Sequence, residues 1–250
     1  MHINPGYFKE KEMVTKLNNK KYKDLSNNLK HMITEMFGVV EEDEIIECSY
    51  HNGYQKPDIK IKCKGVEVFV SIKSGKATEV HEESVKDFIL FLKSEGISKE
   101  SLKTILFYIY GDGTYDGSGA YRYDYNELRL RLKTRIKLLN MELNKNKDFI
   151  KKVVERCLFK GNKESNVEAD YIYFGDCEYG VICSKKQIFK HIDLRTWAYM
   201  SNPHIGPLQF RPHARYINKE VKNEKYRHII DIWWANLFED LNYISNRYDG

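Results

Sequence analysis

An aspartate and a lysine, Asp58 and Lys73, lie at the outer ends of a segment whose pattern is typical of a β-hairpin. Residues 57–63 (PDIKIKC) alternate apolar with charged side chains, and residues 66–73 (VEVFVSIK) are rich in β-branched types, so each stretch predicts a strand. Lys64 and Gly65 between them suit a two-residue turn. The sequence therefore predicts two strands that fold back on each other.

The length of this turn fixes which residues face each other across the hairpin. With Lys64 and Gly65 in the turn, Asp58 lies opposite Ser71, and facing side chains of this kind have Cβ atoms about 5 Å apart. Side chains alternate along a strand, so Lys73 shares the face of Ser71 and lies on the diagonal from Asp58. Neither Asp58 nor Lys73 is an ordinary core residue. The face that they share is therefore either solvent-exposed or a binding site.

The segments around the hairpin predict the elements that hold it. A first helix, ended by Gly38, is predicted by apolar residues at helical spacing: Leu25, Leu29, Met32, Ile33, Met36 and Phe37. A strand is expected at 44–50. After the hairpin, a second helix is expected from Thr78 to Gly96, and the apolar run 102–110 predicts a buried central strand. The predicted order is one helix, three strands, a helix and a strand.

The second half of the chain predicts an α+β elaboration that follows a Gly- and Asp-rich loop at 111–119. Its expected elements are, in order, helices at 125–144 and 149–158, strands at 169–174 and 179–183, a helix at 185–192, a proline-rich irregular loop at 200–216 and a helix at 226–244. We expect residues 1–110 to form the core, with 111–250 as a basic region packed on it.

Positive charge concentrates in that second half. Residues 185–227 contain ten Lys or Arg and three acids, and residues 121–145 contain seven and three. Such stretches suit a phosphate-binding surface, although a solvated lysine-rich surface gives the same composition. The side chains that we expect to contact DNA are those with fork-shaped or amide donors: Arg129, Arg131, Arg135, Gln209, Arg211 and Arg215.

The Pro57-Asp58 pair, the short hairpin and Ser71-Ile72-Lys73, within that element order, resemble the core of the PD-(D/E)XK nuclease superfamily. The resemblance covers about residues 24–110. It implies a restriction-endonuclease-like αβββαβ fold, with a mixed central sheet flanked by helices. It also implies a metal-dependent DNA endonuclease that uses Mg²⁺, for which Mn²⁺ substitutes. In that family Asp58 would bind the metal, the Ile72 carbonyl could be a further ligand, and Lys73 would position or activate the attacking water.

Ser71 departs from the family pattern, because an Asp or Glu normally stands at its position. A neutral hydroxyl is a weak ligand for a hard cation, so another carboxylate would have to replace it. Glu35 on the first helix is the preferred second acid, since the family often uses a glutamate from that helix. Glu82 at the start of the second helix is the other choice. Both have alternative roles, as a solvated helix residue and as a charge that complements the helix dipole.

The remaining features exclude several classes of protein. No apolar run approaches the roughly 20 residues of a membrane span, and the N-terminus lacks a secretory pattern, so a cytoplasmic location is expected. The five cysteines form no metal-binding or disulfide pattern. A nuclease of this type commonly acts as a homodimer. Two alternatives remain open: a nuclease-fold protein that binds nucleic acid without cutting it, and an immunity or interaction module for an acidic partner.

Overall fold

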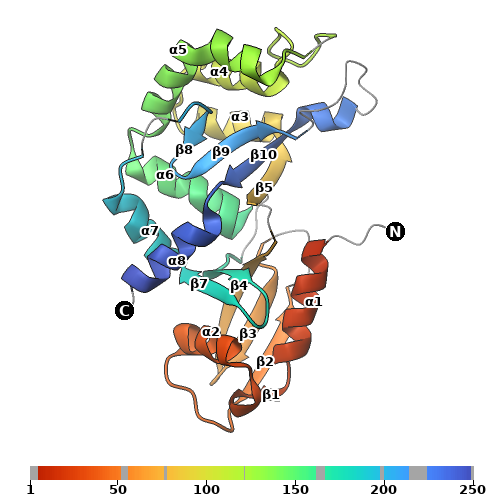
Figure 1. Ribbon diagram of the computed structural model, residues 1–250, viewed down its shortest axis with the longest axis vertical. Helices are drawn as coiled ribbons and strands as arrows, with labels where there is room; N and C mark the ends of the chain where they lie inside the picture. Colours follow the sequence, from red (N-terminus) through yellow and green to blue (C-terminus); the bar gives the residue numbers. More distant parts are fainter. Residues whose placement is uncertain are drawn as a thin grey trace. The chain divides into compact units, whose positions relative to one another are not determined.

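The computed structural model describes residues 5–51, 56–75, 78–120, 122–161, 167–197, 200–213 and 224–248. The chain divides into two compact units. The first unit consists of Met1–Thr78, Glu155–Asp193 and Asn236–Gly250, and the second of Glu79–Val154 and Leu194–Ala235. Each unit has its own β-sheet with helices against it (Figure 1).

The first unit is built on a six-stranded mixed sheet, so the predicted α/β class with a mixed sheet is confirmed. The strands, in spatial order, are β1 (Lys20–Lys21), β2 (Ile45–Tyr50), β3 (Ile59–Cys63), β4 (Val66–Lys73), β6 (Tyr171–Gly175) and β7 (Gly180–Ser184). Neighbouring strands are antiparallel except β4 and β6, which are parallel. The chain leaves this sheet after β4 and returns to it at β6.

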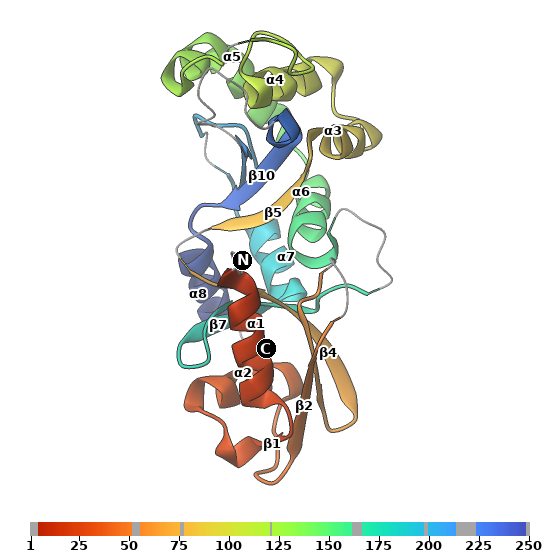
Figure 2. The same cartoon turned by 90° about the vertical axis from the view of Figure 1, so that its right-hand side faces the viewer.

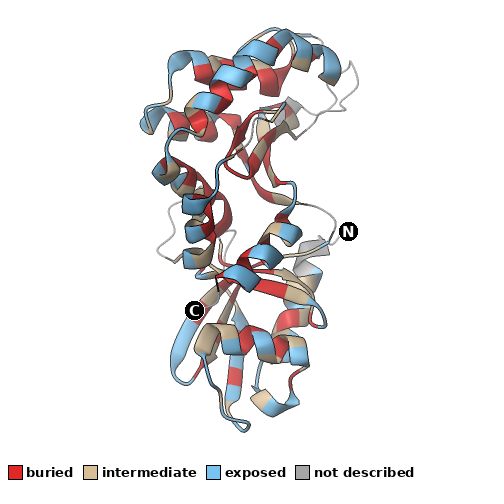
Figure 3. Ribbon diagram, turned by 60° about the vertical axis from the view of Figure 1, so that its left-hand side comes forward, coloured by how far each residue is buried: buried red, intermediate tan, exposed pale blue. Residues whose placement is uncertain are grey.

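Helices cover both faces of the first sheet. They are α1 (Pro5–Leu17), the 3₁₀ turn η1 (Tyr22–Asp24), α2 (Asn27–Phe37), the π-helical segment η2 (Glu155–Lys160), α7 (Lys185–Leu194) and α8 (Leu237–Arg247). Apolar residues of α1 and α2 pack with Ile59, Ile61 and Val70 in one buried cluster. Phe174 of β6 contacts Phe238 of α8, which places α8 on the opposite face. Buried and exposed residues alternate along the helical ribbons (Figure 3), and in α2 the buried ones are Leu29, Met32 and Ile33.

The second unit contains an antiparallel four-stranded sheet with strand order β5 (Glu79–Ser84), β10 (Ile229–Trp234), β9 (Leu208–Pro212) and β8 (His204–Ile205). Figure 2 shows β5 and β10 side by side. The other elements of this unit are α3 (Val85–Ser94), α4 (Lys99–Tyr110), α5 (Tyr125–Leu143), α6 (Lys147–Val154) and the 3₁₀ segment η3 (Glu224–His228). The sheet thus joins a strand from residues 79–84 to three strands that come more than 100 residues later.

The first four predicted elements of the hairpin region are confirmed. The first helix ends at Phe37 with Gly38 as its C-cap, where φ is 71°. Ser26 begins this helix, and its hydroxyl accepts a hydrogen bond from the backbone amide of Leu29. The strands β2, β3 and β4 follow within two residues of the predicted bounds. Local patterning was sufficient here because each element has one buried and one more exposed face.

Two predictions for residues 78–110 are wrong. Residues 79–84 form β5, and the helix begins only at Val85, with Ser84 as its N-cap. Pairing with β10 gives this acid-rich stretch a strand conformation that its composition disfavours. The run 102–110 lies in the helix α4 instead of a strand. Because α4 buries most of its circumference, its sequence is continuously apolar, and such a run does not separate a buried helix from a buried strand.

The predictions near the C-terminus also need correction. The segment 200–216, expected to be irregular, contains β8 and β9. The expected helix at 226–244 is divided into η3, the strand β10 and the helix α8. Position 110, the expected domain boundary, lies inside the second unit.

Two expectations from composition can be compared directly with the fold. All five cysteines are buried free thiols, in agreement with their lack of a disulfide pattern in the sequence. Among the described residues, no helix has both the length and the apolar character needed to cross a bilayer.

Candidate active site

The hairpin of β3 and β4 has the predicted register. Ile59 lies opposite Val70, and Cys63 lies opposite Val66. The turn residues Lys64 and Gly65 have φ values of 53° and 76°, the pair of positive values that a type I′ turn requires. This register brings Asp58, which precedes Ile59, close to Ser71, which follows Val70.

Asp58 and Ser71 face each other at the end of this ladder. The Asp58 amide donates to the Val70 carbonyl at 3.0 Å, just beyond the last strand pair, Ile59 and Val70. The Ser71 hydroxyl donates to Asp58 Oδ2 at 3.0 Å, and the Ile72 amide donates to the same oxygen at 2.5 Å. Asp58 Oδ1 accepts no hydrogen bond from a described residue. One carboxylate oxygen therefore anchors the side chain, and the other can bind a cation.

Ser71 is completely buried, so its hydroxyl acts inside the protein rather than toward solvent. Its partner across the parallel pair of strands is Ile172 of β6, which is also fully buried. A serine in this position is satisfied by donating to Asp58. Its observed role is to hold the Asp58 carboxylate in place.

Lys73 is the last residue of β4 and is partly exposed. It lies two positions beyond Ser71, so it belongs to the same sheet face as Asp58 and Ser71. Its positive charge lowers the pKa of Glu10 and also that of Lys56. Two further ionisable residues, Glu10 and Lys56, therefore lie within reach of the Lys73 charge.

Glu10 supplies a carboxylate that the sequence analysis did not identify. It lies on α1, which was not predicted, and it is partly buried. Burial raises the pKa of Glu10, the negative charge of Asp58 raises it further, and the charge of Lys73 lowers it. Met13 and Leu17, three and seven residues later, are buried against the sheet, so Glu10 is held on the inner side of the helix. That four-residue apolar spacing was the available sequence signal.

Lys56 is the fourth member of the group. Burial lowers its pKa well below the usual lysine value, and the nearby Lys73 charge lowers it further, while Cys157 and Asp58 act in the opposite direction. Desolvation disfavours the charged form of a buried amine, and it is the larger cause of this shift.

The acids chosen from the sequence lie in other surroundings. Glu35, in the last turn of α2, pairs with His31 at 4.0 Å, and its backbone carbonyl accepts a hydrogen bond of 3.5 Å from the Tyr171 hydroxyl. Glu82 belongs to β5 in the second unit, where it lies opposite Asp231. Neither interaction involves Asp58.

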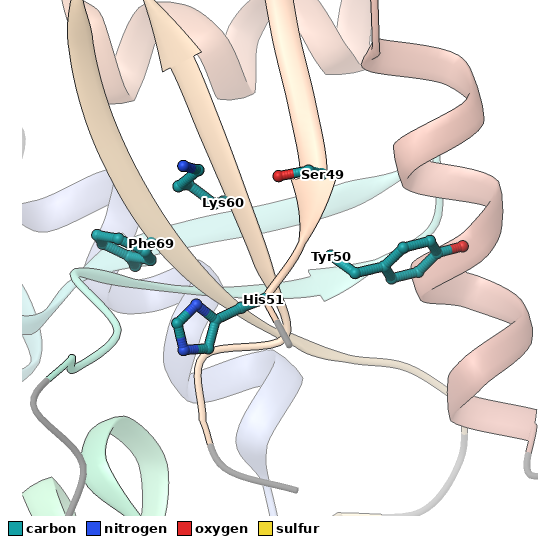
Figure 4. Close-up of a pocket in the computed structure, with 5 residues that line it drawn as sticks. All are labelled: Ser49, Tyr50, His51, Lys60 and Phe69. Atoms are coloured by element: carbon teal, nitrogen blue, oxygen red, sulfur yellow. The ribbon is translucent and has the colours of Figure 1, made fainter. Parts of the chain in front are cut away.

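A surface hollow adjoins Asp58 on the same sheet face. It has a volume of about 360 Å³ and is lined by Ser49, Tyr50, His51, Lys60 and Phe69. Lys60 lies opposite both Ser49 and Phe69 in the ladder, and the His51 amide donates to the Asp58 carbonyl at 3.1 Å. Figure 4 shows the His51 ring turned toward Phe69, while Tyr50 points away from them. The hollow offers a cation, an imidazole and an aromatic ring.

No protein-family model and no curated protein sequence matches this chain. The functional interpretation therefore depends on the geometry of these residues and on the resemblance stated above.

The predicted DNA-contacting residues of α5 are exposed or partly exposed. Arg131 pairs with Glu127 at 2.8 Å and lies over the Tyr123 ring, and Arg129 lies over the Tyr125 ring. Arg135 is exposed. Such arginines are held by their neighbours but keep donors directed to solvent.

The other predicted DNA-contacting residues lie on or after β9. The Arg211 guanidinium is 4.5 Å from the centre of the Trp233 ring, and the Gln209 carbonyl oxygen accepts a hydrogen bond of 3.3 Å from Asn202. Arg215 lies outside the described residues. All six residues remain predictions as DNA contacts.

The residues around Asp58 suit a hard divalent cation. Asp58 Oδ1 and the Glu10 carboxylate are both oxygen donors, and the negative charge of Asp58 raises the pKa of Glu10. A dication held by these oxygens would offset that effect on Glu10. The set contains no cysteine or histidine among its ligands, which favours Mg²⁺ or Mn²⁺ over softer metals.

Proposed function

We propose that this chain is a metal-dependent endonuclease that hydrolyses phosphodiester bonds in DNA, most like a type II restriction enzyme. The observation that carries the proposal is the hydrogen bond from Ser71 to Asp58 next to a hairpin of the predicted register, in which Lys73 follows Ser71 by two residues. Glu10, whose pKa the Asp58 charge raises, is the proposed second carboxylate. An acid pair and a lysine at one sheet end form the minimum set for the reaction.

Each residue has a specific role in this proposal. Asp58 and Glu10 would hold Mg²⁺, with the Ile72 carbonyl as a further ligand, and Ser71 keeps Asp58 oriented. When bound, the ion would supply Lewis acidity and neutralise developing charge on the phosphate. Lys73 would orient the attacking water and balance the charge of the phosphate. Glu35 and Glu82 remain expected ligands only if their surroundings rearrange, and Mn²⁺ would substitute for Mg²⁺.

The arrangement of strands also supports a restriction-endonuclease-like core. Three antiparallel strands, β2 to β4, are followed by a strand that pairs in parallel with the third. The helix and the strand expected at 78–96 and 102–110 are not those of this sheet, and we propose that η2 and β6, later in the chain, take their places after α2 and β2–β4. In this interpretation most of the second unit is an insertion between β4 and the helical segment before β6.

DNA is the proposed partner because the site is open on its cationic side. The hollow next to Asp58 places Lys60 and His51 where a phosphate backbone could follow the sheet face. The basic residues of α5 and β9 would hold the duplex, and a homodimer would allow both strands to be cut.

Plasmid cleavage tests the enzyme directly. Supercoiled plasmid is incubated with wild-type protein in Mg²⁺ or Mn²⁺, and with the variants Asp58→Asn and Lys73→Ala. Asp43→Asn and Lys103→Ala are matched controls, since both residues are surface members of ion pairs. We expect nicked or linear products from wild type and from both controls, with none from the two site variants. Cleavage that survives Asp58→Asn would exclude this site.

Ser71 favours one alternative, a nuclease-fold protein that binds nucleic acid without turnover. A buried hydroxyl replaces the acid that the family normally has. Gel-shift binding that weakens steeply with salt, without cleavage in either metal, would identify this case. Absence of any DNA affinity at low salt would leave the interaction module as the remaining function.

A further inference from the structure

Three residues of the second unit bring metal-ligand types together on one face of its sheet. They are Glu82 of β5, Asp231 of β10, and His213, which follows β9. Each offers one ligand atom, and these atoms all lie within 4.8 Å of one another. The strand registers explain this, because Asp231 lies opposite Glu82 on one side and opposite Arg211 on the other.

The His213 ring is fixed by its neighbours. His213 Nδ1 lies 2.8 Å from Asp231 Oδ1 and 3.6 Å from Glu82 Oε2. Its backbone amide donates to the Ile229 carbonyl, and the Tyr226 ring stacks on it with the centroids 5.2 Å apart. The imidazole therefore keeps one nitrogen directed at the two carboxylates.

Two facing carboxylates require a cation. Like charges directly opposite across a strand pair destabilise the sheet. The Asp231 side chain is only 9% exposed, so water screens it poorly. Burial raises the pKa of Asp231, and its charge, with those of Glu82 and Glu79, raises the pKa of His213 against the effect of burial. The positive charge of Arg211 acts on Asp231 as well, but its guanidinium lies over Trp233.

We propose that Glu82, His213 and Asp231 form a binding site for a divalent transition-metal ion of the zinc class. One imidazole and two carboxylates are ligands that Zn²⁺ accepts in three-residue protein sites. Ligand atoms of a tetrahedral zinc site lie roughly 3.4 Å apart, since each bond is about 2.1 Å long. His213 Nδ1 and Asp231 Oδ1, at 2.8 Å, would have to separate by about 0.6 Å to reach this spacing, whereas His213 Nδ1 and Glu82 Oε2 are already 3.6 Å apart. The Glu82 side chain is 46% exposed and can adjust toward the other two ligands.

The fourth position of such a site would remain open. His213 and Glu82 are 30% and 46% exposed, so solvent reaches the metal position from their side. Three protein ligands with an open position allow water or a phosphate oxygen to bind. The bound ion would also join β5, β9 and β10, which come from distant parts of the sequence.

Zinc titration into chelator-treated protein tests the proposal. The protein used is full-length Asp58→Ala, so that the proposed nuclease site does not contribute. The variants His213→Gln and Glu82→Gln are added to this background, with His31→Gln and Glu127→Gln as controls. Calorimetry gives stoichiometry and affinity, and Co²⁺ absorption reports the coordination geometry. Circular dichroism in chelator confirms that each variant is folded.

We expect one equivalent of Zn²⁺ in the Asp58→Ala background and in both controls, and a loss of affinity on the order of 100-fold in His213→Gln and Glu82→Gln. We also expect Co²⁺ bands of a four- or five-coordinate site that disappear in His213→Gln. Unchanged zinc affinity in His213→Gln would overturn the proposal, as would folded Asp58→Ala protein that binds no zinc. If folded Asp58→Ala protein binds no zinc, the positive charge at this position is a protonated His213 hydrogen-bonded to Asp231. Neither outcome depends on whether the protein cuts DNA.

Discussion

The Ser71 hydroxyl and the Ile72 amide donate to the same oxygen of Asp58, at 3.0 and 2.5 Å. Ser71 therefore positions the Asp58 carboxylate, although it stands where a metal-binding acid is expected from the family resemblance. In the proposed site the second carboxylate comes instead from Glu10 of α1, whose pKa the Asp58 charge raises. A glutamate on a helix would then replace an acid on a strand and carry the same charge.

Ser71→Asp would restore the family pattern and tests this substitution. Position 71 is fully buried, so the new aspartate would place a buried carboxylate beside Asp58. We expect the free energy of unfolding in chelator to fall by about 3 kcal/mol. Mg²⁺ or Mn²⁺ should recover most of that loss. Ser71→Ala, which loses one hydrogen bond, should cost only about 1 kcal/mol and show no added metal dependence. Chemical denaturation with and without metal measures the free energy of unfolding of both variants. If Ser71→Asp loses the same free energy with metal as in chelator, the proposed metal site is contradicted.

Glu10→Gln separates metal binding from folding. Losing a ligand carboxylate should reduce metal affinity and cleavage on the order of 100-fold. Without metal, however, the same change should stabilise the fold at neutral pH, because a partly buried charge beside Asp58 is removed. Thermal melting in chelator measures the second effect, with Glu12→Gln as the control on the same helix. A lower melting temperature for Glu10→Gln at neutral pH would contradict the assigned position.

The pH dependence of this stabilisation follows from the direction of the shift. The pKa of Glu10 is raised in the folded protein above the usual value of 4.5, so the charged form is disfavoured by folding. The destabilisation is absent below pH 4.5, grows as pH rises through the folded pKa and is constant above it. The difference between wild type and Glu10→Gln should therefore disappear when melting is repeated near pH 4.

The turn of the hairpin controls the register that brings Asp58 to Ser71. Gly65→Ala introduces a side chain at φ 76°, and we expect a loss of about 1 kcal/mol in the free energy of unfolding. Lys64→Asn should raise it by a few tenths of a kcal/mol, roughly the preference for Asn at the first position of a type I′ turn. In urea denaturation, the change in the free energy of unfolding should be negative for Gly65→Ala and positive for Lys64→Asn. Changes of the same sign and size would argue against this turn.

The hollow beside the site should contribute to DNA affinity. Lys60→Ala is expected to weaken DNA binding and to lower the salt dependence of the binding constant by about one unit of slope. Glu67 pairs with Lys60 at 2.9 Å, so Glu67→Gln should strengthen binding by releasing the ammonium. Fluorescence anisotropy over a range of salt concentrations measures both, with Lys103→Ala as the control. The hollow is not part of the DNA surface if Lys60→Ala behaves like the control.

The part of the site on the hairpin was predictable because its geometry is local. The identity of the turn residues fixes the register, and the register fixes which side chains share a face. From these two rules the sequence placed Asp58 beside Ser71, and the structure has this register and a hydrogen bond from the Ser71 hydroxyl to Asp58 Oδ2. No contact distant in sequence was needed.

The rest of the site was not predictable in this way. Glu10 lies on a helix that has four consecutive charged residues, 9–12, and buries only Met13 and Leu17 among its described side chains, so its apolar periodicity is weak. The sheet of the second unit depends on pairing between β5 and β10, more than 100 residues apart. Acidic residues in β5 favour the start of a helix until that pairing is known. The cluster of Glu82, His213 and Asp231 was hidden for the same reason.

The most direct test of the central claim is the position of a bound ion. Crystals of the protein soaked in Mn²⁺ would be examined for an anomalous-scattering peak. We predict a peak about 2.1 Å from Asp58 Oδ1, with the Glu10 carboxylate as a second ligand, and no such peak in Asp58→Asn crystals. Manganese bound at full occupancy elsewhere in the first unit, with Asp58 free of metal, would contradict the proposed nuclease site.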